Sequence, residues 1–427
     1  MSAPAGDASP TTTPPSPGAK GATRAAFIFI FITVLTDMLA LGIMVPVLPK
    51  LIVEFEHGDV ARAAEVSGVF GFAWALMQFL ASPVLGALSD RFGRRPIVLL
   101  SNFGLGVDYV LMALAPSLPL LFVGRVISGI TAASYPTASA YIVDVTPPEK
   151  RAASFGMLGA AFGLGFIVGP AVGGLLGGID LRLPFWVAAA LSLANALYGA
   201  FVLPESLPVE RRAAFSLKKA SPIGALSMLT RDRGILGLAA ATFIYSIAHE
   251  SLPSMFVLYT DFRYHFSERM VGISLAIVGV CSTIVAAVLV GPSVKRFGER
   301  STLAFGLLAG AVGFAIYAAA PSTFPFLCGM PFVALWGLAG PAMQSLMSKS
   351  AGPEEQGKLQ GAVSSLRGIT GMVGPLLFTQ GFAFFVGPRA PVFLPGFPYW
   401  LASGLVMMSL LLAMVAARSA ARADSPS

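Results

Sequence analysis

The strongest constraint in this sequence is its series of long apolar runs. One of them lies in "RAAFIFIFITVLTDMLALGIMVPVLPKL" and is long enough to cross the roughly 30 Å hydrocarbon core of a bilayer as a helix. Similar runs recur along the 427 residues, of which 56% are hydrophobic and only 11% charged. Soluble domains carry about a quarter charged residues. The chain is therefore predicted to be an all-α polytopic membrane protein.

Twelve such runs are expected to be membrane-spanning helices. They lie near residues 25–49, 66–88, 96–114, 117–140, 152–177, 183–203, 234–259, 270–292, 301–320, 323–347, 357–385 and 396–417. A polar and basic connector separates six of them from the other six. We expect a disordered cytoplasmic tail (1–23), a first six-helix half (24–203), a cytoplasmic linker (204–233), a second six-helix half (234–418) and a short cytoplasmic tail (419–427).

The two predicted halves share an internal repeat. The stretch "GALSDRFGRRPIVLL", which begins at Gly86, matches "GPSVKRFGERSTLAF", which begins at Gly291. Two similar halves joined by a linker are the architecture of secondary transporters, whose substrate site lies near the membrane midplane between the halves.

The basic residues predict the orientation. Of the 28 Lys and Arg residues, twenty fall on the side of the N-terminus, six on the opposite side and two inside predicted spans. The side rich in Lys and Arg is the cytoplasmic one, so both termini are expected inside. This asymmetry accounts for the net charge of +7 without a nucleic-acid partner. No P-loop or Gly-rich nucleotide motif is present, so ATP coupling is not expected.

Four polar residues of the first half share one depth in the membrane. Asp37 lies roughly 20 Å along its helix, where inserting an ionised carboxylate costs at least about 2.5 kcal/mol. Gln78, Asp108 and Arg125 reach the same middle layer. Because each buried charge needs a partner or a water-filled cavity, this layer predicts a proton and substrate site. The alternative is that Asp108 and Arg125 form an ion pair that only holds helices together.

Several motifs resemble those of a known family. "GALSDRFGRRP" resembles the cytoplasmic loop signature of the major facilitator superfamily at Gly86, Asp90, Arg91, Gly93, Arg94 and Arg95. "GRVISG" is similar to its intramembrane arginine motif, and "GFIVGPAVGG" resembles the antiporter motif of its drug-efflux branch at Gly165, Gly169, Pro170, Gly173 and Gly174. "LTDMLALGIMVPVLP", "AYIVDVTPPEKRAASFG" and "EEQGKLQGAVSSL" resemble the tetracycline exporters within that branch.

The resemblance implies a fold and a function. It implies a monomeric, proton-coupled exporter of an amphiphilic organic compound in a bacterial inner membrane, with the proton as coupling ion and no other cofactor. It places the residues that match Asp37, Gln78 and Asp108 in the substrate and coupling region. Export direction rests on the antiporter motif alone, and proton-coupled uptake or a receptor or assembly protein on the same fold are the alternatives.

The loop signature and the antiporter motif also have physical interpretations. The carboxylates of Asp90 and Asp144, with the neighbouring arginines, predict a network that bridges helices when the inner gate is shut and separates when it opens. Asp90 is also expected to face the start of the eleventh helix, near Pro353–Glu354. The alternative is that these are loop charges without a switching role. The glycines of the antiporter motif predict close helix packing, and Pro170 can kink its helix.

The second half departs from the resembled exporters. Ser282 and Gly310 stand where those exporters carry an intramembrane histidine and an acidic residue. Glu250 and Arg367 appear instead, and one hypothesis is that they pair and restore a protonatable site. The alternative leaves Glu250 hydrated near the outer end of its helix and uninvolved. Trp74, Phe256 and Trp336 are weaker candidates for lining an apolar cavity, since such residues also serve as packing.

An enzyme is not expected. No HExxH motif or Ser–His–Asp cluster is present, and the three histidines are scattered along the chain. No metal site is predicted either. The small-molecule substrate and the lipid bilayer are the expected partners.

Overall fold

The structure, a computed structural model, describes residues 17–132, 134–213, 215, 229, 233–349, 355–388 and 390–423. Over these residues the chain is mainly helical and has no strand, which confirms the predicted all-α fold. The predicted linker 204–233 and the segment Pro353–Glu354 lie largely or wholly outside the described residues.

The helices form two groups along the chain. The first group is α1 (Pro17–Met44), α2 (Leu48–Phe55), α3 (Val60–Phe92), α4 (Arg94–Leu114), α5 (Leu118–Thr131), α6 (Ser134–Val145), α7 (Pro148–Gly177) and α8 (Leu183–Val202), followed by the short turn η1 (Val209–Arg211). The second group is α10 (Arg233–Tyr264), α11 (Glu268–Ile284), η4 (Val285–Leu289), α12 (Val290–Ala319), α13 (Thr323–Cys328), α14 (Met330–Leu335), η5 (Trp336–Leu338), α15 (Ala339–Lys349), α16 (Gln356–Val386) and α17 (Phe397–Ala423).

The number of membrane crossings agrees with the prediction. Within the described residues, eleven helical runs are long and apolar enough to span a membrane. One of them, Glu268–Ala319, has 52 residues. A helix of that length measures about 78 Å, more than twice the bilayer core. The run is broken at Gly298, whose φ of 77° lies in the left-handed region that suits glycine. It therefore makes two crossings, which gives twelve.

The ends of the chain differ from the predicted tails. Helix α1 begins at Pro17, inside the segment 1–23 for which no structure was expected, and α17 continues to Ala423, beyond residue 419. The physical reason is that helix propagation adds one hydrogen bond per residue once a span has formed, so an Ala-rich flank extends it cheaply. Proline is also well tolerated in the first turn of a helix.

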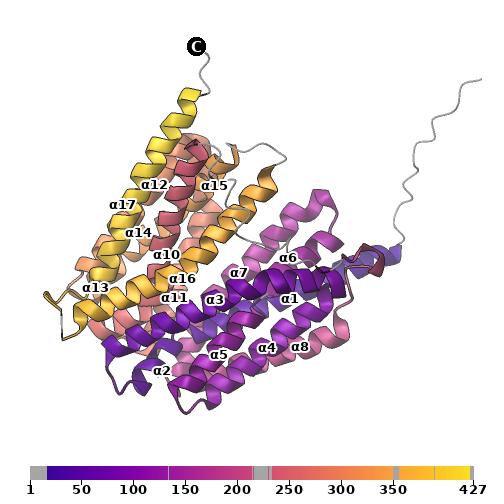
Figure 1. Cartoon of the computed structure of the whole chain (residues 1–427), viewed down its shortest axis with the longest axis horizontal. Helices are drawn as coiled ribbons and strands as arrows, with labels where there is room; N and C mark the ends of the chain where they lie inside the picture. The colour runs from indigo at the N-terminus through magenta and orange to yellow at the C-terminus, as the bar shows by residue number, and fades with distance from the viewer. Residues whose placement is uncertain are drawn as a thin grey trace, which may run out of the picture.

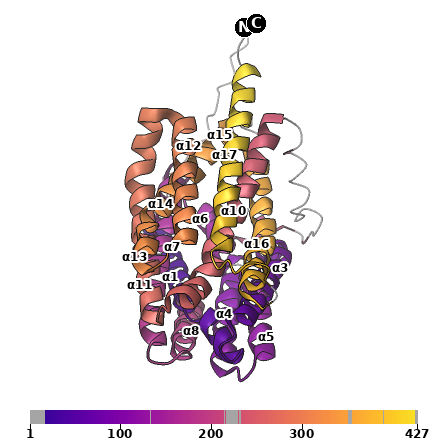
Figure 2. The ribbon, with the colours of Figure 1, turned by 90° about the vertical axis from the view of Figure 1, so that its left-hand side faces the viewer.

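The two groups of helices form two bundles arranged as a V. Figure 1 shows them side by side at the end that carries α2 and α11, and apart toward the end that carries α6 and α15. Two helix pairs join the bundles: α3 packs on α16, and α7 packs on α11. In Figure 2, where the second bundle faces the viewer, α16 runs down onto α3.

The glycines of the antiporter motif place α7 against two neighbours. Gly165, Gly169 and Gly173 face α1, and a Cβ on Gly173 would overlap the carbonyl oxygen of Ile43. Gly174 faces the other bundle, where its Cβ would lie 2.9 Å from Cα of Gly272 on α11. The carbonyl oxygen of Pro170 also faces Gly272. The close packing expected from this motif is therefore present, both within the first bundle and between bundles.

These contacts generate a first prediction, that Gly173→Ala destabilises the protein. The added methyl overlaps the backbone of α1, and overpacking of this kind costs about 1–3 kcal/mol. Gly159→Ala is the matched control, because Gly159 lies in the same helix and a Cβ added there would have no atom within 4 Å. Thermal unfolding of the purified variants should show a lower Tm for Gly173→Ala and an equal or higher Tm for Gly159→Ala. Equal Tm values for the two variants would contradict the packing.

Candidate functional site

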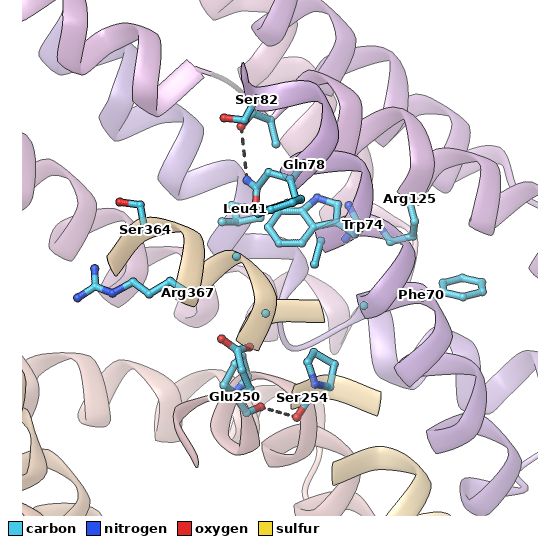
Figure 3. Close-up of a pocket in the computed structure, with 18 of the residues that line it drawn as sticks. Leu41, Phe70, Trp74, Gln78, Ser82, Arg125, Glu250, Ser254, Ser364 and Arg367 are labelled. Carbon is cyan, nitrogen blue, oxygen red and sulfur yellow. Dashed lines mark hydrogen bonds between the residues drawn. The ribbon is translucent and has the colours of Figure 1, made fainter. Parts of the chain in front are cut away.

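A cavity of about 1160 Å³ lies between the two bundles. Its wall comes mainly from α3 and α16, with smaller parts from α2 and α10, and Figure 3 shows side chains that line it. The aromatic members are Phe70, Trp74, Phe79 and Phe166, and the charged or amide-bearing members are Gln78, Asp90, Arg125, Glu250 and Arg367. The wall is thus mostly apolar with a few polar groups, as in sites that bind small amphiphilic molecules.

One end of the cavity is closed by contacts between the bundles. The ammonium group of Lys50, in α2, lies 3.1 Å from a carboxylate oxygen of Asp261 and 3.1 Å from one of Glu268. It also donates a hydrogen bond to the carbonyl oxygen of Phe266. These partners belong to α10, α11 and the turn between them. Only 10% of the Lys50 side chain is exposed, so the contact is shielded from solvent and stronger than a surface ion pair.

The cavity reaches the other end of the molecule at Asp90, whose side chain is 51% exposed. The ion pairs here each stay within one bundle. Arg94 binds Asp90 at 2.6 Å and Asp144 at 3.1 Å in the first bundle, and Lys349 binds Glu299 at 2.8 Å in the second. The cavity is therefore closed by cross-bundle ion pairs at the Lys50 end and opens toward the Asp90 end.

The loop signature forms a carboxylate–guanidinium network through one arginine, and the network is present although the cavity opens at this end, so the predicted separation is not seen in this structure. Arg94 bridges α3, α4 and α6 by binding Asp90 and Asp144. Arg91 stacks on the ring of Phe92, and Arg95 donates to the carbonyl oxygen of Ala200. The side chains of these two arginines form no ion pair with any carboxylate that the structure describes. Gly86 lines the cavity.

Glu205 completes this network and was not predicted. Its carboxylate accepts hydrogen bonds from the backbone N–H groups of Arg94, at 2.8 Å, and Arg95, at 3.3 Å, and so caps α4. Gly93 makes room for it: φ is 107°, and a Cβ there would overlap the carboxylate of Glu205. Asp144 also accepts a hydrogen bond from Ser206.

Asp37 is buried behind the cavity wall and does not line it. Only 3% of it is exposed, and its carboxylate accepts a hydrogen bond of 3.2 Å from the amide of Asn195. Asn102, with its amide nitrogen turned toward Asp37, donates to both carboxylate oxygens at 3.1 and 3.2 Å. Asn195 in turn bonds the backbone carbonyl of Thr33. Asp37 thus joins α1 to α4 and α8 through two amides.

Asp108 and Arg125 form the ion pair that the sequence left as an alternative. Their side chains meet at 3.5 Å, and Asp108 is fully buried while Arg125 lines the cavity. Arg125 also donates to the hydroxyl of Ser128 at 2.9 Å, and that hydroxyl accepts from the indole of Trp74 at 3.3 Å. A polar chain therefore runs from Trp74 in the cavity wall to Asp108 behind it.

Gln78 lies in the wall as predicted, and its amide donates to the carbonyl oxygen of Ala132 at 3.4 Å. Together with Trp74 and Arg125 it forms one of the polar parts of the first-bundle wall (Figure 3). The predicted layer thus separates into residues that reach the cavity and the two carboxylates that do not.

Glu250 and Arg367 both line the cavity but do not pair. Glu250 is half-buried and Arg367 is exposed, and no ion pair joins these two described residues. In Figure 3 the guanidinium of Arg367 points away from Glu250. The hypothesis that they pair is therefore not realised in this structure. The alternative leaves Glu250 hydrated and uninvolved; Glu250 does line the cavity, and its involvement stays a prediction. The neighbouring residue of Glu250, His249, packs its ring on Trp336, with ring centroids 5.7 Å apart.

Two of the three predicted aromatic cavity residues are in the core of the second bundle. Phe256 and Trp336 are each 3% exposed and do not line the cavity. Trp336 packs on Tyr245 and Phe314, and Phe256 on Phe326. The reason is that aromatic rings gain more from packing on one another than from facing a hydrated wall. Trp74 differs because its indole N–H donates a hydrogen bond to the hydroxyl of Ser128.

Sequence reasoning missed Lys50, Asn102, Asn195, Ser128 and Glu205. The two asparagines carried a usable signal, because each is an amide inside an apolar run at the depth of Asp37. Lys50 was counted as a loop charge, since nothing in the sequence shows which carboxylates of the other half lie opposite it.

Comparisons of the sequence with known proteins identify its relatives. The family model described as Major Facilitator Superfamily matches residues 30–375. The tetracycline resistance protein of class C from Escherichia coli is 38% identical over 358 residues, which are 84% of this chain and 90% of that protein. The class G protein from Vibrio anguillarum is 37% identical, over 83% and 90%.

A solved structure shares the fold. The human organic anion transporter MFSD10 (TETRAN) superposes with a TM-score of 0.67 at 23% identity, covering 92% of this chain and 99% of that one. The relatives are transporters rather than enzymes, and the apolar runs make this chain a multi-pass membrane protein. The chain belongs to the Major Facilitator Superfamily, in the family of the tetracycline resistance proteins.

Proposed function

We propose that this protein exports an amphiphilic organic compound across a bacterial cytoplasmic membrane in exchange for protons. The observation that carries the proposal is the cavity between the bundles, which is closed at the Lys50 end and reaches the Asp90 end. A cavity open to one side at a time is what alternating access requires. The relatives' name, tetracycline resistance protein, favours export of a drug-like compound.

From the distribution of basic residues we propose that the Asp90 end faces the cytoplasm, together with both termini. With that orientation the cavity is open to the inside, and we propose that the protein works as a monomer. Lys50 then holds the outer side closed, because its ion pairs with Asp261 and Glu268 must break before the cavity opens outward. The Arg94 network stays within the first bundle in this state, and we propose that it contacts the second bundle when the inner side closes.

We assign the exchange of protons in the second bundle to Glu250. It is the carboxylate of the second bundle that lines the cavity, where a proton and a substrate can both reach it. Asp37 is held by two amides and Asp108 by Arg125, so in this state neither is open to the cavity. We propose that these two carboxylates position α1, α4 and α8, and take part in coupling only after the bundle rearranges.

The substrate is proposed to be tetracycline-like in size and amphiphilicity, but with a different pattern of charges. Ser282 and Gly310 replace the charged residues of the resembled exporters, and Ser282 does not line the cavity. A Cβ on Gly310 would lie 2.6 Å from the indole of Trp336, so the structure leaves no room there for an acidic side chain. Glu250 and Arg367 supply charge instead.

A second prediction concerns coupling: Glu250→Gln abolishes proton-driven transport. Glutamine keeps the size and polarity of the side chain but cannot release a proton. The assay is substrate-induced proton movement in inverted vesicles across a compound panel that includes a tetracycline. Exchange of labelled for unlabelled substrate without a proton gradient should persist, because it needs no proton release. Glu65→Gln, at an exposed position of α3, is the matched control. Unchanged proton-driven transport in Glu250→Gln would remove Glu250 from the mechanism.

A third prediction concerns the outer gate: Lys50→Met increases the outward-open population by tenfold or more. Each charged hydrogen bond that is lost contributes about 1.5–3 kcal/mol, and about 1.4 kcal/mol is a tenfold change in population. The measurement is the rate at which a membrane-impermeant maleimide added outside labels Ser67→Cys, in a background with Cys281→Ser and Cys328→Ser. Ser67 lines the cavity in α3.

Arg62→Met is the matched control for the gate experiment. Arg62 pairs with Glu56 at 3.1 Å within the first bundle, so its loss leaves the contact between bundles intact. Equal labelling rates in Lys50→Met and Arg62→Met would show that the ion pairs of Lys50 do not hold the outer side closed.

The same vesicle assay separates export from the alternative functions. Accumulation of substrate in inverted vesicles, driven by acid inside, indicates export. Movement of substrate together with protons would support uptake, and no response to any compound of the panel would favour a receptor or assembly protein on the same fold.

A further inference from the structure

Four charged side chains line the cavity, and two of them are bound to other side chains. Arg125 is held by Asp108 and by the hydroxyl of Ser128. Asp90 is held by Arg94. In each case the charge is compensated inside the first bundle, so it is not available in full to a bound molecule.

The other two, Glu250 and Arg367, have no ion pair with any side chain that the structure describes. Within the described residues, the side chains that form hydrogen bonds with these two residues are the hydroxyls of Ser254 and Thr370, and both donate to backbone carbonyl oxygens rather than to the charged groups. An ionised group at membrane depth needs water or a countercharge. When a substrate displaces the cavity water, its own charges must supply that compensation.

The offset between the backbones of Glu250 and Arg367 along the helices follows from the packing of α16 on α10. A Cβ on Gly374 would overlap Cβ of Glu250, so Glu250 stands level with Gly374. Arg367 precedes Gly374 by seven residues, which is two helical turns on the same face, or about 10 Å. The backbones of the two residues are therefore offset by about 10 Å along the helices, and the guanidinium of Arg367 points away from Glu250 (Figure 3).

An aromatic surface faces the interval between the two charges. The ring of Phe79, from α3, lies against Gly368, where a Cβ would be 2.6 Å away. Trp74 precedes it by five residues on the same helix and also lines the cavity (Figure 3). A molecule placed here would meet aromatic rings along its body, a carboxylate at one end and a guanidinium at the other.

We propose that the substrate is a dipolar amphiphile, with a basic group that binds Glu250 and an acidic group that binds Arg367. The proposal rests on the proposed proton exchange. A basic group and a proton compete for the Glu250 carboxylate, which makes their movements opposite. A purely anionic substrate would bind best when Glu250 is protonated and would travel with the proton. Arg367 stays charged throughout, because a guanidinium is not deprotonated in proteins.

The test uses two dyes that differ in one group. Rhodamine 110 carries a cationic xanthene and a free carboxylate, and rhodamine 123 is its methyl ester and lacks the negative charge. Binding to the purified full-length chain in lipid nanodiscs is measured by fluorescence polarisation. The wild type should bind rhodamine 110 about tenfold more tightly than rhodamine 123, since one charged hydrogen bond contributes at least that much.

Variants assign the discrimination to Arg367. Arg367→Gln should bind both dyes equally, and Arg367→Lys should retain part of the preference because it keeps the charge but loses the planar fork. Arg300→Gln is the matched control, since it removes the same charge at an exposed position outside the cavity, and the preference should persist. Glu250→Gln should weaken binding of both dyes, because both carry the cationic xanthene.

Several results would overturn the inference. They are equal affinity of the wild type for the two dyes, a preference that survives in Arg367→Gln, and binding of neither dye by a chain that still exports a tetracycline. Failure of the proposed function looks different: no compound would move protons in vesicles, while the dye preference and its dependence on Arg367 would remain.

Discussion

The cost of an uncompensated charge in hydrocarbon governs where the polar residues of this protein lie. Asp108 meets that cost by pairing with Arg125, and Asp37 by accepting hydrogen bonds from two asparagine amides. Glu250 and Arg367 face a cavity large enough to hold water. The charges of the first bundle are therefore compensated by the protein, whereas those of the second depend on what fills the cavity. In the state observed, the cavity charges of the second bundle are therefore the ones whose environment changes with the molecule in the cavity.

The contact between the bundles has two physical components that suit a reversible gate. Glycine pairs such as Gly174 and Gly272 let α7 and α11 approach backbone to backbone, which gives close packing without interlocking side chains. Lys50 adds charged contacts that are strong only while they stay shielded. Such ion pairs weaken once water reaches them. Close helix packing and shielded ion pairs therefore hold the two bundles together at the Lys50 end.

Sequence reasoning predicted the all-helical fold, but not the direction in which each polar residue points from its helix. Apolar run length set the crossings, including the pair merged through Gly298, because bilayer thickness limits helix length. Depth follows from residue number, but rotation about a helix axis depends on tertiary packing. Asp37 and Glu250 were both placed within the membrane, yet only Glu250 faces the cavity. Trp336 was misplaced for the same reason, and the partners of Lys50 lie more than 200 residues away.

The packing around Trp336 explains why the charges of the second bundle occupy these positions. Its indole lies against Gly310 and packs edge-on or tilted against Phe314 and Tyr245. An acidic side chain at Gly310 would break this aromatic cluster, at a cost of several large buried contacts. On α10 and α16, by contrast, Glu250 and Arg367 already face the cavity and need no space in the core. A chain that keeps the aromatic cluster can therefore hold charge on the cavity face of α10 and α16, at Glu250 and Arg367, and we propose that Glu250 exchanges the proton there.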